Sequence, residues 1–230
     1  NKLIAEYRKI SASSDLLVTS ELYLSGYPPE DLVMRREFQE IIHSKTRDIV
    51  SETLDSRAWM ILGTPWVEND ELYNAALVIG EGKIQQVCRK SRLPNYGVFD
   101  EIRVFSQGPT PTPVLIHNVP FGILICEEIW SAEPVRGLKD SGAEILIVIN
   151  GSPYDVTKIA EREKQTFSRI DETKLPLVYI NQVGGQDELV FDGLSFVVDA
   201  SGNKIAQLPA WSCSKTEIKF NHDGKKWQPE

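Results

Sequence analysis

The chain has 230 residues, of which 41% are hydrophobic and 25% are charged, and its formal net charge is −8. A chain of this length can bury one large hydrophobic core or two small ones. The acidic balance, with no Lys/Arg cluster longer than a pair, argues against nucleic acid and anionic membranes as partners.

The first half of the chain alternates between helical and strand-like patterns. Apolar residues at helical spacing predict helices over residues 1–10 and 35–54. Short apolar runs predict strands over 16–18, 58–62, 72–79 and 83–87. Gly63 is the expected end of the second strand, and Gly80–Gly82 is the expected turn between the last two.

The second half begins with another hairpin pattern, residues 114–116 and 121–125 on either side of Val119-Pro120. Ser131 is the expected N-cap of a short helix that stops at Gly142, and strand, helix and strand together predict a βαβ unit. Further patterns predict a strand over 145–149, a helix over 154–173, a strand over 177–181 and a hairpin of 194–199 with 204–208. Without repeats or linkers, we expect one α/β domain with mixed sheets over residues 1–230.

Three cysteines are widely spaced and odd in number: Cys88, Cys126 and Cys213. This spacing suits neither a disulfide framework nor a C-x-x-C metal site. No apolar run approaches the roughly 18 residues of a membrane span, and the N-terminal segment is amphipathic rather than signal-like. We therefore expect a soluble cytoplasmic protein with reduced thiols.

Cys126 ends the apolar stretch FGILICEEIW, residues 121–130, at the carboxyl end of a strand that feeds a helix. Open α/β sheets bind ligands at such strand ends, and the backbone N–H of Glu127 could face a developing oxyanion there. For an isolated cysteine, a buried structural thiol is the competing interpretation. Cys88 and Cys213 keep that interpretation.

A thiol nucleophile needs a base or a cation, because a free cysteine with a pKa near ~8.5 is mostly protonated at neutral pH. The three histidines lie in a charged helix, a hairpin and a polar tail: His43, His117 and His222. Surface exposure explains each of them better than catalysis does. A Cys-His protease is therefore a weak hypothesis.

Glu21 and Lys90 are better placed, since each follows a predicted strand. Taken singly, each is expected to be a solvated surface residue. Together with Cys126 they form a complete set for acyl transfer, in which the glutamate takes the thiol proton and the lysine stabilises the oxyanion.

Four ordered segments carry a family resemblance: ELYLSGYPPED (21–31), KSRLPNYGVFDEIRVF (90–105), CEEIW (126–130) and NQVGGQDELVFDGLSF (181–196). Together they resemble the glutaminase domain of glutamine-dependent NAD synthetases, a branch of the nitrilase (carbon–nitrogen hydrolase) superfamily. The resemblance implies a four-layer αββα sandwich. It places a catalytic triad on Glu21, Lys90 and Cys126, and it adds Glu101 as a second carboxylate beside the lysine.

The resemblance also implies a substrate, L-glutamine, with contacts from Tyr96, Phe99, Glu127 and Ser152. The implied reaction runs through a glutamyl thioester and releases ammonia, which reaches a synthetase domain that makes NAD with ATP and magnesium. No metal or cofactor is expected for the glutaminase part, and a homo-oligomer is expected. Two interpretations remain for the segment QDELVFDG (186–193): an interface with the synthetase domain or a neighbouring subunit, or an ordinary loop.

The sequence departs from the family in four places. Thr19-Ser20 stands where relatives usually carry Phe-Pro, and Glu128 stands where they usually carry Asp. The family's first strand and the synthetase phosphate-binding loop are absent, so we expect a part of a longer two-domain protein.

Two alternatives to glutamine hydrolysis remain: another amidase or nitrilase of the superfamily, and a catalytically silent interaction module.

Overall fold

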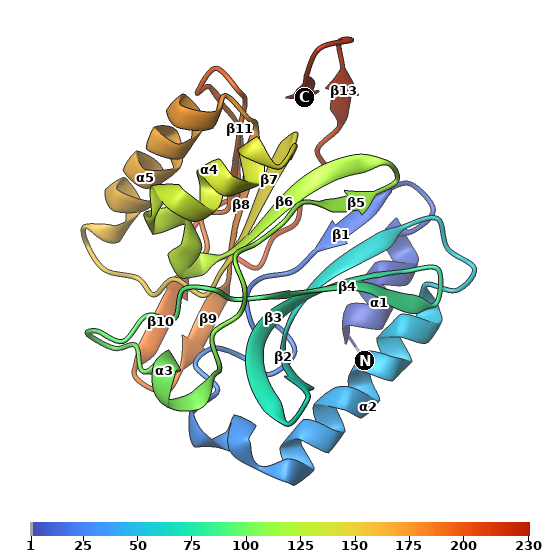
Figure 1. Ribbon diagram of the computed structural model, residues 1–230, viewed down its shortest axis with the longest axis vertical. Helices are drawn as coiled ribbons and strands as arrows, with labels where there is room; N and C mark the ends of the chain where they lie inside the picture. The colour runs from blue at the N-terminus through green and yellow to red at the C-terminus, as the bar shows by residue number, and fades with distance from the viewer. Residues whose placement is uncertain (1) are drawn as a thin grey trace. The chain divides into compact units, whose positions relative to one another are not determined.

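The computed structural model describes residues 2–230, so residue 1 of the first predicted helix lies outside the described residues. The chain divides into two compact units, Asn1–Pro109 and Thr110–Glu230 (Figure 1). No helix within residues 2–230 combines the length and the apolar character needed to cross a bilayer.

The first unit contains a four-stranded sheet in the order β1-β2-β3-β4. Strand β1 runs parallel to β2, and the other neighbours are antiparallel. Two long helices and two short helical turns accompany the sheet. The elements are α1 (Lys2–Ile10), β1 (Leu16–Val18), η1 (Glu30–Met34), α2 (Arg36–Glu52), β2 (Trp59–Glu68), β3 (Glu71–Gly80), β4 (Lys83–Arg89) and α3 (Glu101–Val104).

The core of the first unit lies between this sheet and helices α1 and α2 (Figure 1). Alternate residues of β2 and β3, among them Met60 and Leu77, point to one face because side chains alternate along a strand. Tyr7 of α1 packs on that face, and its hydroxyl donates a hydrogen bond of 2.5 Å to the carbonyl of Ala58.

The second unit contains a six-stranded sheet in the order β12-β11-β8-β7-β6-β5. Strands β6, β7 and β8 are parallel neighbours, and the outer strands are antiparallel. The elements are β5 (Val114–Ile116), β6 (Val119–Ile125), η2 (Cys126–Trp130), α4 (Ala132–Asp140), β7 (Ile145–Asn150), α5 (Lys158–Thr173), β8 (Leu177–Asn181), β9 (Val183–Gln186), β10 (Leu189–Asp192), β11 (Phe196–Val198), β12 (Lys204–Gln207), β13 (Phe220–His222) and β14 (Trp227–Pro229).

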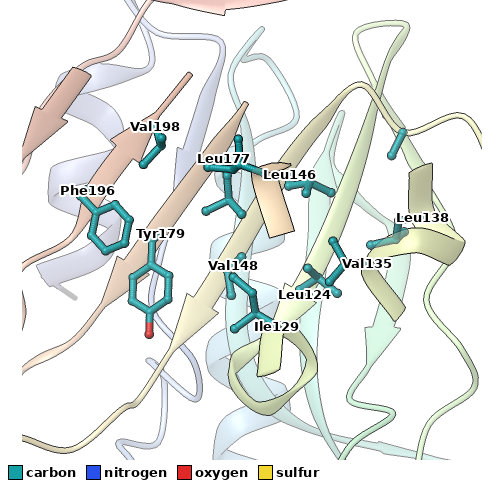
Figure 2. Close-up of a cluster of buried hydrophobic side chains, with 12 residues drawn as sticks. Leu124, Ile129, Val135, Leu138, Leu146, Val148, Leu177, Tyr179, Phe196 and Val198 are labelled. Atoms are coloured by element: carbon teal, nitrogen blue, oxygen red, sulfur yellow. The ribbon is translucent and has the colours of Figure 1, made fainter. Parts of the chain in front are cut away.

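Figure 2 shows the apolar cluster between this sheet and helices α4 and α5. Leu124, Val148 and Tyr179 come from the three parallel strands, and Val135 comes from α4. The rings of Tyr179 and Phe196 stack with their centroids 4.9 Å apart. The predicted βαβ unit is confirmed, since β6, α4 and β7 follow one another and the two strands are parallel.

Several predicted boundaries are wrong. Strand β2 continues past Gly63 to Glu68, because its partner β3 stays paired with it along that whole length. The β5–β6 turn falls on His117-Asn118, both with positive φ, so Val119-Pro120 belongs to the strand. The predicted start of α4 is confirmed, because Ser131 occupies its N-cap position, although its side chain makes no capping bond.

Helix α5 begins at residue 158 rather than 154. The preceding residues form a turn in which the carboxylate of Asp155 accepts hydrogen bonds from the backbone and hydroxyl of Thr157. Two hairpins, β9–β10 and β13–β14, were not predicted. Their strands are only three or four residues long, and β9 contains two glycines, so the apolar pattern that marks a strand is too short to stand out there.

Candidate active site

Glu21 lies in the loop that follows β1, and its side chain is fully buried. The hydroxyl of Thr19 ties this loop to β2, because it accepts a hydrogen bond from the Gly63 N–H at 3.0 Å. The loop runs so close to β2 that a Cβ on Gly63 would lie 2.0 Å from the Ser20 carbonyl oxygen. Gly63 is therefore required for this approach of the two backbones.

Lys90 follows β4, and its side chain is fully buried as well. Because β1 is parallel to β2 and two antiparallel pairings separate β2 from β4, β1 and β4 run in the same direction. Both strands therefore end at the same edge of the sheet. The Lys90 ammonium lies 2.6 Å from Glu21 Oε1 and 2.8 Å from Glu101 Oε1.

Glu101 begins helix α3 and is buried, 5% exposed. The hydroxyl of Tyr27 donates a hydrogen bond of 2.8 Å to its Oε1 atom. Asn74 of β3 donates to Glu21 Oε1 at 2.8 Å and to Glu101 Oε2 at 3.4 Å. Arg103 pairs with Asp31 and Asp100 on the surface, so the alternative pairing of Glu101 with Arg103 is not the one observed.

The charges of this cluster do not balance if all three groups ionise, since one ammonium faces two carboxylates. Burial raises the pKa of Glu101, and the negative charge of Glu21 raises it further, while the Lys90 ammonium acts in the opposite direction. A proton is therefore retained on Glu101 more readily than on a solvated carboxyl. The lysine itself has carboxylate partners on two sides, as a buried ammonium requires.

Tyr96 and Phe99 lie on the loop that leads from Lys90 to Glu101. Their rings form an edge-to-face pair with centroids 5.4 Å apart, and Phe99 also lies 6.5 Å from the ring of Tyr27. Tyr96 is 53% exposed. Tyr96 is thus linked through Phe99 to Tyr27, whose hydroxyl bonds Glu101. An exposed aromatic ring of this kind is suited to contact a substrate, and this role stays a prediction.

Cys126 lies in the second unit, at the point where β6 ends and the helical turn η2 begins. Its backbone has a φ of 45°, in the left-handed region that non-glycine residues seldom adopt, and its side chain is 4% exposed. Glu128 closes the turn, because its carboxylate accepts a hydrogen bond of 2.6 Å from the Ile125 N–H. A strained cysteine at a strand end is a recurring feature of functional sites.

Ser152 follows β7 and Asn181 ends β8, so both lie at the same sheet edge as Cys126. The registers pair Ile125 with Ile149 and Asn150 with Asn181 along the three parallel strands. The Ser152 N–H donates to Asn181 Oδ1 at 2.9 Å. Sequence reasoning missed Asn74, Tyr27 and Asn181. Asn74 is a polar residue inside β3, Asn181 ends β8, and Tyr27 lies in the loop between β1 and η1, so no common pattern marks them.

The histidines support no alternative site. His117 and Cys126 lie at opposite ends of β6, a seven-residue strand that spans roughly 20 Å. Burial and the charge of Arg47 lower the pKa of His43. The His43 ring packs against Trp66, with the two ring centroids 4.5 Å apart. Within residues 2–230, no group of three or more His, Cys, Asp or Glu side chains could hold a metal ion.

The structure thus brings Glu21, Lys90 and Glu101 into one buried cluster in the first unit. It places Cys126, Glu127 and Ser152 at strand ends in the second unit. The joint action of the two groups stays a prediction.

Comparison with known proteins gives the family. The carbon–nitrogen hydrolase model matches residues 1–221. The glutamine-dependent NAD(+) synthetase of Rhodobacter capsulatus is 36% identical over 218 residues, 95% of this chain and 39% of that protein. The protein of the same name from Thermotoga maritima is 43% identical over 195 residues, 84% of this chain and 34% of that protein. The chain therefore spans about two fifths or less of the length of these relatives.

Solved structures agree on the fold. The glutamine-dependent NAD+ synthetase of Acinetobacter baumannii, in complex with ADP, has a TM-score of 0.90 and 35% identity, covering 99% of this chain and 43% of that one. A carbon–nitrogen hydrolase of Helicobacter pylori has a TM-score of 0.77 at 23% identity, over 90% of this chain and 78% of that one, which supports the fold alone. The predicted α/β fold of the nitrilase superfamily is confirmed, and the chain belongs to the carbon–nitrogen hydrolase family.

Proposed function

We propose that this chain is the glutamine-hydrolysing part of a glutamine-dependent NAD synthetase and that both units form one hydrolase domain. The observation that carries the proposal is the fully buried Lys90 ammonium between two carboxylates, at 2.6 and 2.8 Å. A lysine so costly to bury is readily explained if it must meet a developing negative charge. The names of the relatives, which are 36% and 43% identical, support glutamine as the substrate.

In the first half of the proposed reaction, Glu21 takes the thiol proton of Cys126, and the sulfur attacks the side-chain amide carbon of glutamine. The carbonyl π electrons move to oxygen, where Lys90 and the N–H of Glu127 stabilise the oxyanion. Glu21 then gives its proton to the amide nitrogen. The carbon–nitrogen bond breaks, ammonia leaves and a glutamyl thioester remains on Cys126.

In the second half, Glu21 takes a proton from water as the water oxygen attacks the thioester carbon. The carbon–sulfur bond breaks, glutamate leaves, and Glu21 returns the proton to the sulfur. Glu101 holds Lys90 in place during both halves through its contact of 2.8 Å with the ammonium, and burial raises the pKa of its carboxyl.

Substrate contacts are proposed for Tyr96, Phe99, Glu127 and Ser152. The ammonia would pass to a synthetase domain, which alone would use ATP and magnesium, within a homo-oligomer. We propose a cytoplasmic setting for this chemistry, in which the thiols stay reduced.

The test is ammonia release by the purified protein from L-glutamine, compared with simple amides and nitriles. We expect glutamine to be preferred and Cys126→Ala to lower turnover to background while leaving the fold intact, because only one sulfur atom is lost. Cys88→Ala is the matched control, since Cys88 is a half-buried thiol of β4 with no proposed role.

An electrophilic glutamine analogue followed by mass spectrometry locates the reactive thiol, which we expect to be Cys126. An adduct on Cys88 would refute the assignment. Preference for simple amides or nitriles would favour another hydrolase of the superfamily, and turnover of none of these compounds would favour the silent interaction module.

A further inference from the structure

Asn74 is a fully buried polar residue of β3, at the start of a run of buried residues that reaches Gly80. Leu77 and Ile79 belong to the core on the helix side of the sheet, so the alternation of side chains along the strand turns Asn74 to the opposite face. A polar side chain in such a run is destabilising unless hydrogen bonds compensate for its burial.

The nitrogen of the Asn74 side-chain amide donates to both carboxylates of the buried cluster. It lies 2.8 Å from Glu21 Oε1 and 3.4 Å from Glu101 Oε2. The shorter hydrogen bond is the stronger one, so the amide favours Glu21. The backbone carbonyl of Asn74 accepts a hydrogen bond of 2.9 Å from the Lys90 N–H. Asn74 therefore contacts all three charged residues of the cluster.

The oxygen of the same amide is left without compensation. Within residues 2–230, no donor meets Asn74 Oδ1, which is shielded from solvent. Turning the amide over would bring this oxygen against the Glu21 carboxylate, so the carboxylates fix its orientation. A buried acceptor that lacks a donor destabilises a fold, and a leucine of similar shape would carry no such group. Stability alone therefore does not explain an asparagine at this position.

Glu21 Oε1 accepts two hydrogen bonds, from Asn74 Nδ2 at 2.8 Å and from the Lys90 ammonium at 2.6 Å. A carboxylate oxygen has two lone pairs, so both lone pairs of Oε1 are engaged. Hydrogen bonds donated to the charged form of a carboxyl group favour that form. Oε1 is therefore a poor proton acceptor, and a proton that arrives at Glu21 is directed to Oε2.

We propose that Asn74 is a positioning residue that keeps Glu21 ionised and fixes its Oε1 atom, so that Oε2 takes the proton of the Cys126 thiol. This inference rests on the proposed hydrolysis of glutamine, in which Glu21 is the base. Glu101 receives only the longer bond from Asn74, which leaves it as the carboxylate that holds Lys90. The amide thus helps to separate the roles of the two carboxylates.

Asn74→Leu and Asn74→Ala test this role, because both remove the donor but change the packing in opposite directions. Without the donor, Glu21 is easier to protonate, while the other ionisable groups of the cluster remain: Lys90, Glu101 and Tyr27. We expect the acidic limb of kcat/KM for glutamine to move up by roughly one to two pH units in both variants, the size for one lost hydrogen bond to an ionised group. Above that limb, KM should change little, because the proposed role involves no contact with the substrate.

Thr64→Val is the matched control, since Thr64 is a fully buried polar residue of the neighbouring strand β2 whose hydroxyl bonds the Pro65 carbonyl instead. This variant should leave the acidic limb where it is. A fall of kcat/KM by the same factor at every pH, a limb that moves in only one of two folded Asn74 variants, or an equal shift in Thr64→Val would overturn the inference while glutamine hydrolysis stands. Circular dichroism monitors folding, and if one Asn74 variant does not fold, the other decides alone.

NMR of protein that carries isotope-labelled glutamate carboxyl carbons follows the protonation of Glu21 without turnover, and Glu21→Gln identifies its signal. We expect this signal to titrate at a higher pH in Asn74→Leu than in the wild-type protein. An unchanged titration would overturn the inference. Wild-type protein that releases no ammonia from glutamine would overturn the proposed function, whereas the titration would still decide whether Asn74 holds Glu21 in its charged form.

Discussion

Replacing Lys90 by methionine tests whether the buried cluster of the first unit is held by charge. Methionine keeps most of the volume of the lysine stem but removes the ammonium, leaving Glu21 and Glu101 without their cation, which lies 2.6 and 2.8 Å from them. Removing one partner of a buried ion pair typically costs about 3–5 kcal/mol of unfolding free energy. We expect a loss of that size for Lys90→Met at pH 7.

The sign of the pH dependence follows from the carboxyl groups. The Lys90 charge is the strongest influence that lowers the pKa of Glu101, so its removal raises this pKa further above the ordinary 4.5. A carboxyl with a raised folded-state pKa stabilises the fold fully below its unfolded pKa, and this stability is lost as the pH rises through the folded pKa. The variant should therefore regain stability as the pH falls toward 4.5, by up to about 1.4 kcal/mol per pH unit for each proton bound.

Urea unfolding followed by tryptophan fluorescence between pH 4.5 and 8 measures both quantities. Arg89→Met is the matched control, because Arg89 is the neighbouring residue of β4 and its pair with Glu68 is partly exposed. Partly exposed pairs contribute about 1 kcal/mol or less. A Lys90→Met variant that is no less stable than Arg89→Met, or whose stability does not rise on acidification, would show that charge does not hold this cluster.

Two further substitutions probe the same unit. Glu101→Gln removes the carboxyl with the raised pKa, so unfolding free energy should fall less steeply as the pH rises above 4.5; an unchanged slope in urea titrations would contradict the raised pKa. Gly63→Ala should cost about 3 kcal/mol and lower ammonia release, because its Cβ would lie 2.0 Å from the Ser20 carbonyl oxygen. Gly137→Ala in α4, where nothing lies within 4 Å of the added Cβ, should instead stabilise by up to about 1 kcal/mol in urea unfolding, and equal effects of the two changes would refute this steric argument.

The sequence was informative wherever function depends on strand ends. Glu21 and Lys90 were selected because each follows a strand, and the equal direction of β1 and β4 places both at one edge. The order and direction of the strands in the sheet are enough to bring the two side chains together. Cys126 was selected by the same reasoning, and β6 does end there.

The partners of these residues could not be predicted, because they come from distant parts of the chain. Tyr27 precedes Glu101 by 74 positions, and Asn74 precedes it by 27. Such hydrogen bonds exist only after the sheet has formed, so no local pattern encodes them. The role of Glu101 rests on the family resemblance alone. From its neighbours in the sequence, a surface ion pair between Glu101 and Arg103 would be the more natural expectation.

Buried ion pairs occur in both units at the ends of strands: Lys90 with two carboxylates, and Arg162 with Asp192. Apolar residues of similar volume would often stabilise a fold as well or better, since burial of charge carries a large desolvation cost. Stability therefore does not account for either pair. Each is better explained by what it holds in position, an ammonium group in the first unit and the Ser152 hydroxyl in the second, and positions of this kind are where substitutions should alter catalysis out of proportion to their effect on folding.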